Sequence, residues 1–317
     1  MINEITNNLT IFPEQAARVF HGRGQKFSGY EKLNIEWYPP YLFVQNFSEA
    51  LDPAIEVELN VLFATQLQIG CIVIQNRTRP ELSSYILCER VIVNQSTDKK
   101  APSELPVTLW ANLSAELSCQ VTLGKNQNTG VFLDMRAGWD WVRQHANDKN
   151  VLNLFSYTSV FSLFALAGGA NRVTNMDMAA NVLKTAQRNH QKNDLSSGKS
   201  AFYKRDILKS AQQYSKMGPY DLIIIDPPPY QKKSFRGWQD YEKLLNRSRA
   251  CLTEKGCLFV CLNNPQATSQ EFIAKLEAMF PDAVSIENIA TAPEIKEENT
   301  DKGLKTVAVY FKNLTEK

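Results

Sequence analysis

From Val151 onwards, short apolar stretches alternate with stretches of helical periodicity, and this alternation constrains the fold more than any other feature of the 317-residue sequence. Strands that alternate with helices build a mostly parallel sheet with helices on both faces. We therefore predict a doubly wound, seven-stranded α/β domain. The expected strands are 151–155, 172–177, 201–206, 221–226, 257–262, 283–289 and 306–311. Three helices are expected at 179–193, 238–252 and 269–279, and two further helices are expected to end at Ala167 and at Ser215.

Residues 1–105 predict a smaller unit, an N-terminal arm followed by an α/β accessory domain that binds substrate. Its strands are expected at 41–47, 71–75 and 84–93 and its helix at 53–68. The polar, proline-containing stretch 94–106 is expected to be a surface connection. The second domain then covers 106–317 and begins with a hairpin within 109–123 and a short helix at 139–145.

Composition excludes several classes of protein. The sequence has 35 Lys and Arg against 33 Asp and Glu, a net charge of +2, so it does not hold nucleic acid by bulk charge alone. Its six cysteines contain no CxxC pair, and with three histidines no zinc site is predicted. The amino terminus lacks the pattern of a secretory signal, and no stretch has the length of a membrane span. We expect a cytoplasmic protein with reduced thiols, no membrane partner and no metal.

Polar residues end five consecutive strands of the predicted sheet. They are Asn153–Ser159, Asp177, Asp206, Asp226 and Asn263–Asn264. Each acidic residue alone is explained as readily by the cap of the following helix. Together they fall on one edge of a parallel sheet, the edge where such sheets bind ligands.

The second and third strand ends predict an adenosine site. Asp177, with Met178 beside it, is placed to accept hydrogen bonds from both ribose hydroxyls. Asp206 can accept from the adenine amine while Ile207 and Leu208 cover the ring. A dinucleotide would also need a glycine-rich turn for its pyrophosphate, and 153–161 contains no glycine, so the pattern favours S-adenosylmethionine.

The strongest local signal is Asp-Pro-Pro-Pro-Tyr at 226–230. Its prolines stiffen the turn, so Asp226, Pro227, Pro228 and Tyr230 are expected to hold an acceptor group in line with an activated methyl group. The Tyr230 ring is suited to stacking on a nucleobase. The simpler alternative is a proline-rich turn that closes a helix–sheet junction.

Two further segments are candidates for RNA contact. In 231–238, basic residues that could bind phosphates alternate with aromatic residues that could stack on bases: Lys232, Lys233, Phe235, Arg236 and Trp238. The alternative is a solvated loop anchored by its aromatic rings. Near the amino terminus, Arg18-Val19-Phe20-His21-Gly22-Arg23-Gly24 could be a phosphate-contacting arm, although a lone histidine is more often structural.

Three ordered motifs resemble class I S-adenosylmethionine-dependent methyltransferases, and within them the bacterial ribosomal RNA large-subunit methyltransferases I (cytosine-5) and K (guanine-N7). They are TGVFLDMR at 129–136, NLFSYT at 153–158 and DPPPY at 226–230. The resemblance implies a Rossmann-like fold and a cofactor site that includes Asn153, Phe155, Tyr157, Asp177, Asp206 and Asp226, with Asp134 and Arg136 at its rim. Alternatively, Arg136 pairs with Asp134 or with a helix end, and Asp134 caps the following helix.

The sequence departs from the family pattern at three places. Ser159 stands where the family has glycine, so the backbone approaches the cofactor less closely. Asn263 stands where the cytosine-5 members have their nucleophilic cysteine, which disfavours covalent attack on a pyrimidine carbon; Cys261, two residues earlier, is the remaining candidate nucleophile. Asn263-Asn264 is instead similar to the Asn-Asn of the guanine-N7 members, and could read a base edge or cap a helix. The family's amino-terminal RNA-binding module is expected to be absent.

These patterns favour a methyltransferase that acts on a base nitrogen in RNA, ribosomal by resemblance. Near-neutral charge and the lack of the RNA-binding module favour an alternative acceptor, a protein or a small molecule. Ser159 favours a third possibility, a catalytically silent protein that binds RNA or the ribosome.

Overall fold

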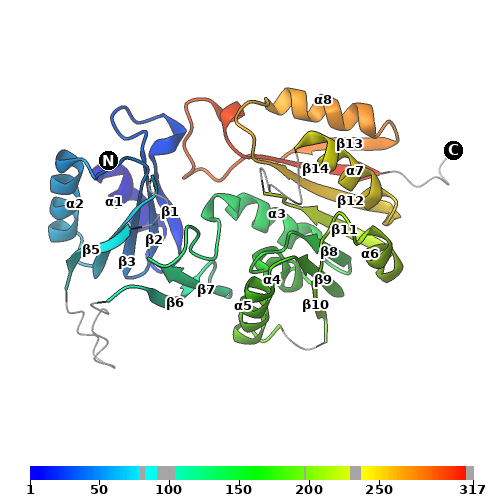
Figure 1. Cartoon of the computed structure of the whole chain (residues 1–317), viewed down its shortest axis with the longest axis horizontal. Coiled ribbons are helices and arrows are strands. Elements are labelled where there is room, and N and C mark those ends of the chain that lie inside the picture. The colour runs from blue at the N-terminus through cyan, green and yellow to red at the C-terminus, as the bar shows by residue number, and fades with distance from the viewer. Residues whose placement is uncertain (79–82, 91–103, 196–197, 229–236, 312–317) are drawn as a thin grey trace. The chain divides into compact units, whose positions relative to one another are not determined.

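The computed structural model describes residues 1–78, 83–90, 104–195, 198–228 and 237–311. The chain forms two compact units (Figure 1). The first consists of Met1–Asp134 and Ala292–Asn299, and the second of Met135–Thr291 and the described residues from Thr300 to Phe311. The first unit thus extends beyond the boundary expected at residue 105.

The first unit is a five-stranded sheet in the order β1-β2-β3-β4-β5, with β3 and β4 parallel and the other neighbours antiparallel. Helices α1 and α2 pack on one of its faces through residues such as Ile5, Leu9, Leu59 and Leu62. Helix α2 begins where Asp52 accepts a hydrogen bond from the Ala54 amide, an ordinary N-cap. The elements are α1 (Ile2–Ile11), β1 (Ala17–His21), a 3₁₀ turn (Gly22–Gly24), β2 (Leu33–Tyr38), β3 (Tyr41–Asn46), α2 (Pro53–Thr65), β4 (Cys71–Asn76) and β5 (Ser83–Glu89).

The prediction of an N-terminal arm is wrong. Helix α1 and strands β1 and β2 occupy it, and β1 and β2 are buried along their whole length. The sequence did not predict these strands because each is short and includes buried polar residues such as Arg18 and Glu36, which leave no continuous apolar run. The hairpin is confirmed as β6 (Val107–Asn112) and β7 (Ser118–Leu123), which pair antiparallel within the first unit.

The second unit confirms the doubly wound α/β prediction. Its seven strands follow the order β10-β9-β8-β11-β12-β14-β13, and only β14 runs antiparallel to its neighbours. The elements are a 3₁₀ turn (Leu133–Met135) at the junction, α3 (Arg136–His145), β8 (Asn150–Leu154), α4 (Val160–Ala167), β9 (Arg172–Asp177), α5 (Ala180–Lys192), β10 (Ser200–Lys204), α6 (Ala211–Met217), β11 (Tyr220–Ile225), α7 (Trp238–Arg249), β12 (Leu252–Leu262), α8 (Ser269–Met279), β13 (Ala283–Asn288), a 3₁₀ turn (Thr300–Lys302) and β14 (Lys305–Phe311).

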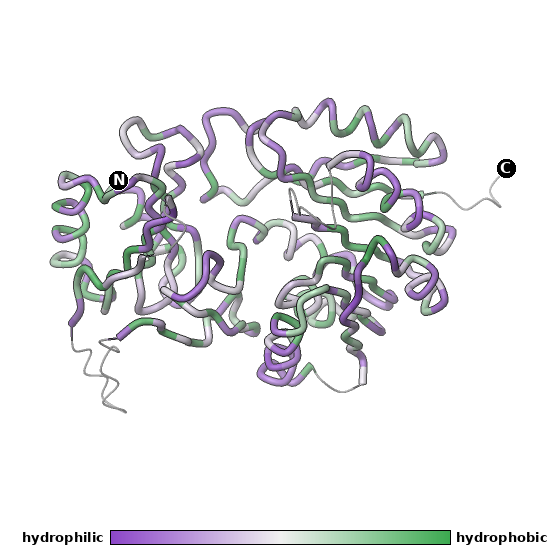
Figure 2. Tube along the Cα trace, in the orientation of Figure 1, coloured by the Kyte–Doolittle hydropathy of each residue, from purple (hydrophilic) through white to green (hydrophobic). Residues whose placement is uncertain are grey.

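Both faces of the large sheet are covered by helices, and its central strands are the most hydrophobic part of this unit (Figure 2). On one face, Ile223 and Leu258 pack with side chains of α6, α7 and α8, such as Tyr241 and Phe272. On the other face, Phe259 contacts aromatic rings of α3 and α4. Among the described helices, none is long and apolar enough to cross a lipid bilayer.

The strand order fixes where a ligand can bind. The chain runs from β8 through β9 to β10 at one edge, and then returns to β11 on the other side of β8. The carboxyl ends of β8 and β11 therefore flank the point where the winding reverses, which is the usual ligand site of such sheets. The residues that follow these two strands are Phe155–Ser159 and Asp226–Pro228.

Candidate active site at the carboxyl edge of the large sheet

The turn after β8 has an unusual backbone. Phe155, Tyr157 and Ser159 have φ angles of 55°, 48° and 62°, in the left-handed region that L-residues rarely adopt. Each such residue costs roughly 1–2 kcal/mol. Three of them within five residues persist only because the surroundings hold the loop, and strain of this kind concentrates at functional sites.

Asp177 is one of the groups that hold this loop. One carboxylate oxygen accepts from the Tyr157 amide at 3.0 Å, and the other accepts from the Ala179 amide at 2.9 Å. The side chain thus ties the end of β8 to the end of β9. Each carboxylate oxygen has a second lone pair, so the predicted ribose contact remains compatible with these bonds.

A chain of buried side chains supports the loop from below. The Asn153 amide donates to Asn175 at 3.1 Å, and the Asn175 amide donates to the Ser162 hydroxyl at 3.1 Å. His190 lies 3.0 Å from that hydroxyl through Nε2, while its Nδ1 lies 2.8 Å from the Ala186 carbonyl. Because the carbonyl only accepts, Nδ1 carries the proton and the Ser162 hydroxyl donates to Nε2. Burial lowers the pKa of His190 to about 4, so the ring is neutral at pH 7.

Ser159 is the N-cap residue of α4 and is fully buried. Among the described residues, its hydroxyl has no hydrogen-bond partner. The position combines a left-handed backbone with an unsatisfied polar atom, and glycine would avoid both costs.

The predicted adenine-binding residues follow β10. Asp206 accepts from the Lys209 amide at 3.4 Å, and its other oxygen lies 3.4 Å from the Lys209 ammonium group. Ile207 is buried in the core, whereas Met178 after β9 is 43% exposed. Asp206 and Met178 are at least partly accessible at this edge, whereas Ile207 is not, and the roles of all three as cofactor ligands remain predictions.

Asp226 follows β11 next to a buried thiol of β12. Cys261 is 1% exposed. Burial raises the pKa of its thiol well above the usual value, and the charge and hydrogen bond of Asp226 raise it further. The Tyr241 hydroxyl donates to the Cys261 carbonyl at 2.7 Å. Since the thiolate is the nucleophilic form of cysteine, Cys261 is unsuited to covalent attack.

A cavity of about 270 Å³ lies beyond the ends of β11 and β12. It brings together six residues that the sequence singled out: Pro227, Pro228, Trp238, Cys261, Asn263 and Asn264. The remaining lining residues include Tyr241 of α7 and Glu271, Phe272 and Lys275 of α8. A cavity with aromatic walls and a few polar groups is the usual form of a small-molecule or base pocket.

Trp238 forms one aromatic wall of this cavity. Its ring meets Tyr241 and Phe272 edge-on at 5.7 Å and 6.2 Å between centroids, and the Lys275 ammonium group lies 4.5 Å from its centroid. Trp238 is therefore anchored to the core and also lines the cavity, and its stacking on a base stays a prediction. Tyr230, Lys232, Lys233, Phe235 and Arg236 lie outside the described residues.

The two asparagines after β12 differ in surroundings. The Asn264 side chain accepts from the Gln266 amide at 2.9 Å and shapes a turn. Helix α8 is instead capped by Thr268 and Glu271, so neither asparagine caps it. Asn263 is exposed at the cavity, where its amide can contact a bound group.

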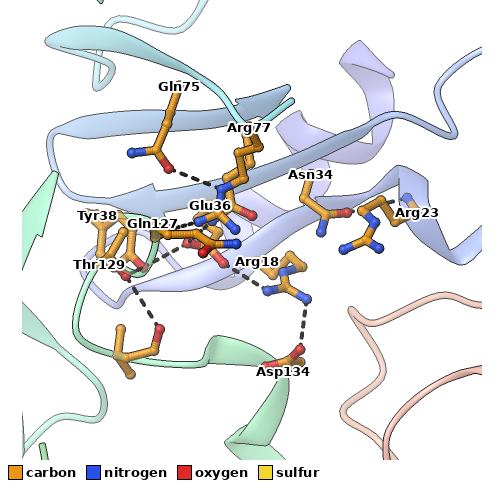
Figure 3. A network of polar contacts seen from close by, with 12 residues as sticks. Arg18, Arg23, Asn34, Glu36, Tyr38, Gln75, Arg77, Gln127, Thr129 and Asp134 are labelled. Atoms are coloured by element: carbon orange, nitrogen blue, oxygen red, sulfur yellow. Dashed lines mark hydrogen bonds and ion pairs between the residues drawn. The ribbon is translucent and has the colours of Figure 1, made fainter. Parts of the chain in front are cut away.

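Asp134 has a partner that the sequence analysis missed. Its carboxylate accepts from Arg18 at 3.1 Å (Figure 3). It does not cap α3, whose N-cap residue is Met135. Arg136 begins α3. Burial raises the pKa of Asp140, and the charges of Arg136 and Arg143 oppose that rise.

Sequence reasoning also missed Tyr241, Lys275 and the Asn175–Ser162–His190 chain. Tyr241 and Lys275 stand on helices whose rotation relative to the sheet is set by packing. No motif marks them, because their role depends on which helix faces meet at the cavity.

A family model for S-adenosylmethionine-dependent methyltransferases matches residues 17–311. The chain belongs to this family. YwbD of Bacillus subtilis (strain 168) is 27% identical over 270 residues, which are 84% of this chain and 65% of YwbD. The ribosomal RNA large subunit methyltransferase I of Pseudoalteromonas translucida (strain TAC 125) is 38% identical over 160 residues, 48% of this chain and 39% of that enzyme.

Methyltransferase K/L of the ribosomal RNA large subunit from Alteromonas mediterranea is 37% identical over 188 residues, 58% of this chain and 26% of that protein. The chain thus spans from about a quarter to just under two thirds of the length of these relatives.

Two solved structures share the methyltransferase fold. SMU.776 complexed with SAH has a TM-score of 0.80, at 22% identity over 98% of this chain and 80% of that one. The SAM-dependent methyltransferase from Agrobacterium tumefaciens has a TM-score of 0.65, at 19% identity over 89% and 87%.

Proposed function

We propose that this chain transfers the methyl group of S-adenosylmethionine to a base nitrogen in RNA, with ribosomal RNA as the substrate. The observation that carries the proposal is the cavity lined by Pro227, Pro228 and Asn263, next to Asp226 and beyond the ends of β11 and β12. Its family membership and the ribosomal RNA methyltransferases among its relatives support the same conclusion.

The residues at the ends of β8, β9 and β10 suit the cofactor. The backbone of Phe155–Ser159 is turned into a rigid loop, and Asp177 joins that loop to the next strand while keeping acceptor capacity for ribose hydroxyls. Asp206 and Ile207 would hold the adenine. When bound, S-adenosylmethionine supplies a methyl group already activated by its sulfonium charge.

The remaining work of the protein is positioning. Asp226 and Asn263 would hold the edge of the base, the proline turn would limit its motion, and the Trp238 wall would exclude water from one side. Asp226 can accept a hydrogen bond from a base N–H, and Asn263 can both donate and accept.

The burial of Cys261 favours nitrogen over carbon as the acceptor. Methylation of a pyrimidine carbon needs a nucleophile that first adds to the ring, and the raised pKa keeps this thiol protonated. A base nitrogen presents its own lone pair, so alignment with the methyl group is enough.

The test is methyl transfer in vitro with tritiated S-adenosylmethionine and unmodified large-subunit ribosomal RNA. The wild type is expected to label the RNA, Asp226→Ala to lose most of the activity, and Cys261→Ala to keep it. Labelling of bulk protein instead of RNA would show a different acceptor. No heat of S-adenosylmethionine binding by calorimetry, together with tight RNA binding, would show a silent RNA-binding protein.

A further inference from the structure

The accessory sheet has a second face that is polar. Side chains alternate along a strand, so the residues between the apolar ones of β1 to β4 point away from α1 and α2. They include Arg18, Glu36, Gln45 and Gln75, and all are buried. Such a face must be held together by hydrogen bonds, because buried polar groups without partners are costly.

Arg18 and Glu36 form the centre of this face. The Glu36 carboxylate accepts from Arg18 at 2.9 Å, from Tyr38 at 2.8 Å and from Gln45 at 3.3 Å. Arg18 also donates to Asp134 at 3.1 Å (Figure 3). Both carboxylates of the cluster are therefore engaged with Arg18.

Two further arginines flank this centre and share one aromatic ring. The guanidinium carbon of Arg23 lies 4.3 Å from the centroid of Phe47, and that of Arg77 lies 5.5 Å from the same centroid. Arg77 also donates to Gln75 at 3.1 Å and to the Gln127 carbonyl. In the part of the chain that the structure describes, neither guanidinium group has a carboxylate at ion-pair distance.

The three guanidinium groups repel one another. Burial lowers the pKa of Arg23, and the charge of Arg18 lowers it further, with Asp134 opposing. Burial also lowers the pKa of Arg77. The charge of Glu36 raises this pKa, and the charges of Arg18 and Arg23 lower it. The three arginines and the two carboxylates Glu36 and Asp134 leave one positive charge in excess. Glu297 is not counted, because it lies beside His21 at 3.4 Å.

Their contact with Phe47 places these two arginines where they can bind an anion. Each guanidinium carbon lies over the ring at a distance typical of a cation–π contact, and this contact leaves N–H donors at the edge of the guanidinium group able to bind. Guanidinium edges match the spacing of phosphate oxygens, and a monoanion would balance the excess charge. Arg23 is exposed, so the site is open to a large ligand.

We propose that Arg23 and Arg77, stacked on Phe47, bind a phosphodiester group of the RNA that this chain methylates. The proposal rests on the proposed function, because RNA is taken as the partner. It assigns one contact with the RNA backbone to the accessory domain. The phosphate-contacting arm that the sequence predicted at 18–24 includes Arg23 but not Arg77. His21 of that segment is buried beside Glu297 and is not part of the proposed site.

The experiment is filter binding of unmodified large-subunit ribosomal RNA to the full chain over a series of salt concentrations. Arg23→Gln and Arg77→Gln are each expected to weaken binding about ten-fold at moderate salt and to lower the salt dependence of log K by about one. In methylation assays the KM for RNA should rise with kcat nearly unchanged. Arg90→Gln is the matched control: this arginine of the same unit also lies on a ring, 4.0 Å from the centroid of Phe63, but outside the cluster.

The outcomes separate the two claims. If the wild type methylates RNA but Arg23→Gln and Arg77→Gln bind like the wild type, or if Arg90→Gln weakens binding as strongly, the site is wrong and the function stands. If the wild type binds RNA with the predicted dependence on Arg23 and Arg77 but methylates none, the site stands and the function is wrong. Absence of RNA binding by the wild type overturns the site directly. Thermal melting of each variant checks that it folds.

Discussion

Replacement of Ser159 by glycine is expected to stabilise the protein. Ser159 has φ 62°, is fully buried, and has a hydroxyl without a partner among the described residues. Release of the left-handed strain returns roughly 1–2 kcal/mol. The extra freedom of glycine in the unfolded chain takes back about 0.4–1 kcal/mol, and removal of the orphan hydroxyl adds about 1 kcal/mol or more.

The net gain in the free energy of unfolding is therefore about 1–3 kcal/mol, or roughly 2–4 °C of Tm for each kcal/mol in a domain of this size. Ser159→Ala keeps the strain and removes only the hydroxyl, so it should lie between the wild type and Ser159→Gly. Asp194→Gly is the control for the backbone effect alone, since Asp194 has φ 56° on the surface.

Chemical denaturation with far-ultraviolet circular dichroism gives the order of stability, and calorimetry gives the affinity for S-adenosylmethionine. We expect tighter cofactor binding by Ser159→Gly, because the backbone can approach more closely. If Ser159→Gly is less stable than both the wild type and Ser159→Ala, the hydroxyl has a partner that supports the loop, and the reasoning about strain fails.

Three further predictions concern the same unit. Asp177→Asn should lose about 1–3 kcal/mol of stability, because its amide group turns a donor towards one of two backbone N–H groups; unchanged melting would contradict this. Cys261 should stay unlabelled by a thiol reagent at pH 8 in the native protein, since burial and Asp226 raise its pKa; rapid labelling would reopen the covalent mechanism. His190 has a pKa of about 4 when folded, below the usual value of about 6.5, so the unfolded state binds its proton first. Stability should therefore fall by up to about 3 kcal/mol as pH drops from about 6.5 to about 4, and His190→Gln should flatten that part of the pH profile.

The large sheet was predictable because its sequence is locally consistent. Strands with an apolar core and helices with one apolar face leave little choice of architecture, and α8 begins and ends at the expected residues. The expected helix 238–252 was too long: α7 ends at Arg249 and β12 begins at Leu252. Helix ends depend on caps and tertiary contacts, which a periodic pattern does not contain.

The accessory unit was harder to predict, and so were the supporting residues of the site. Strands β1 and β2 bury Arg18 and Glu36, so their burial leaves no apolar run in the sequence. The sequence also did not reveal that Arg18, 116 positions earlier, binds Asp134. Long-range ion pairs of this kind leave no local pattern. The strand-end residues, by contrast, follow directly from topology, because consecutive parallel strands end at one edge.

The central claim is methyl transfer to a base nitrogen in ribosomal RNA, and nucleoside mass spectrometry tests it most directly. Large-subunit RNA would be compared between a strain without the gene and strains complemented with the wild type or Asp226→Ala. We predict that one N-methylated nucleoside is lost on deletion, restored by the wild type and not by Asp226→Ala. An unchanged set of N-methylated nucleosides, or the loss of a C5-methylated pyrimidine instead, would contradict the account.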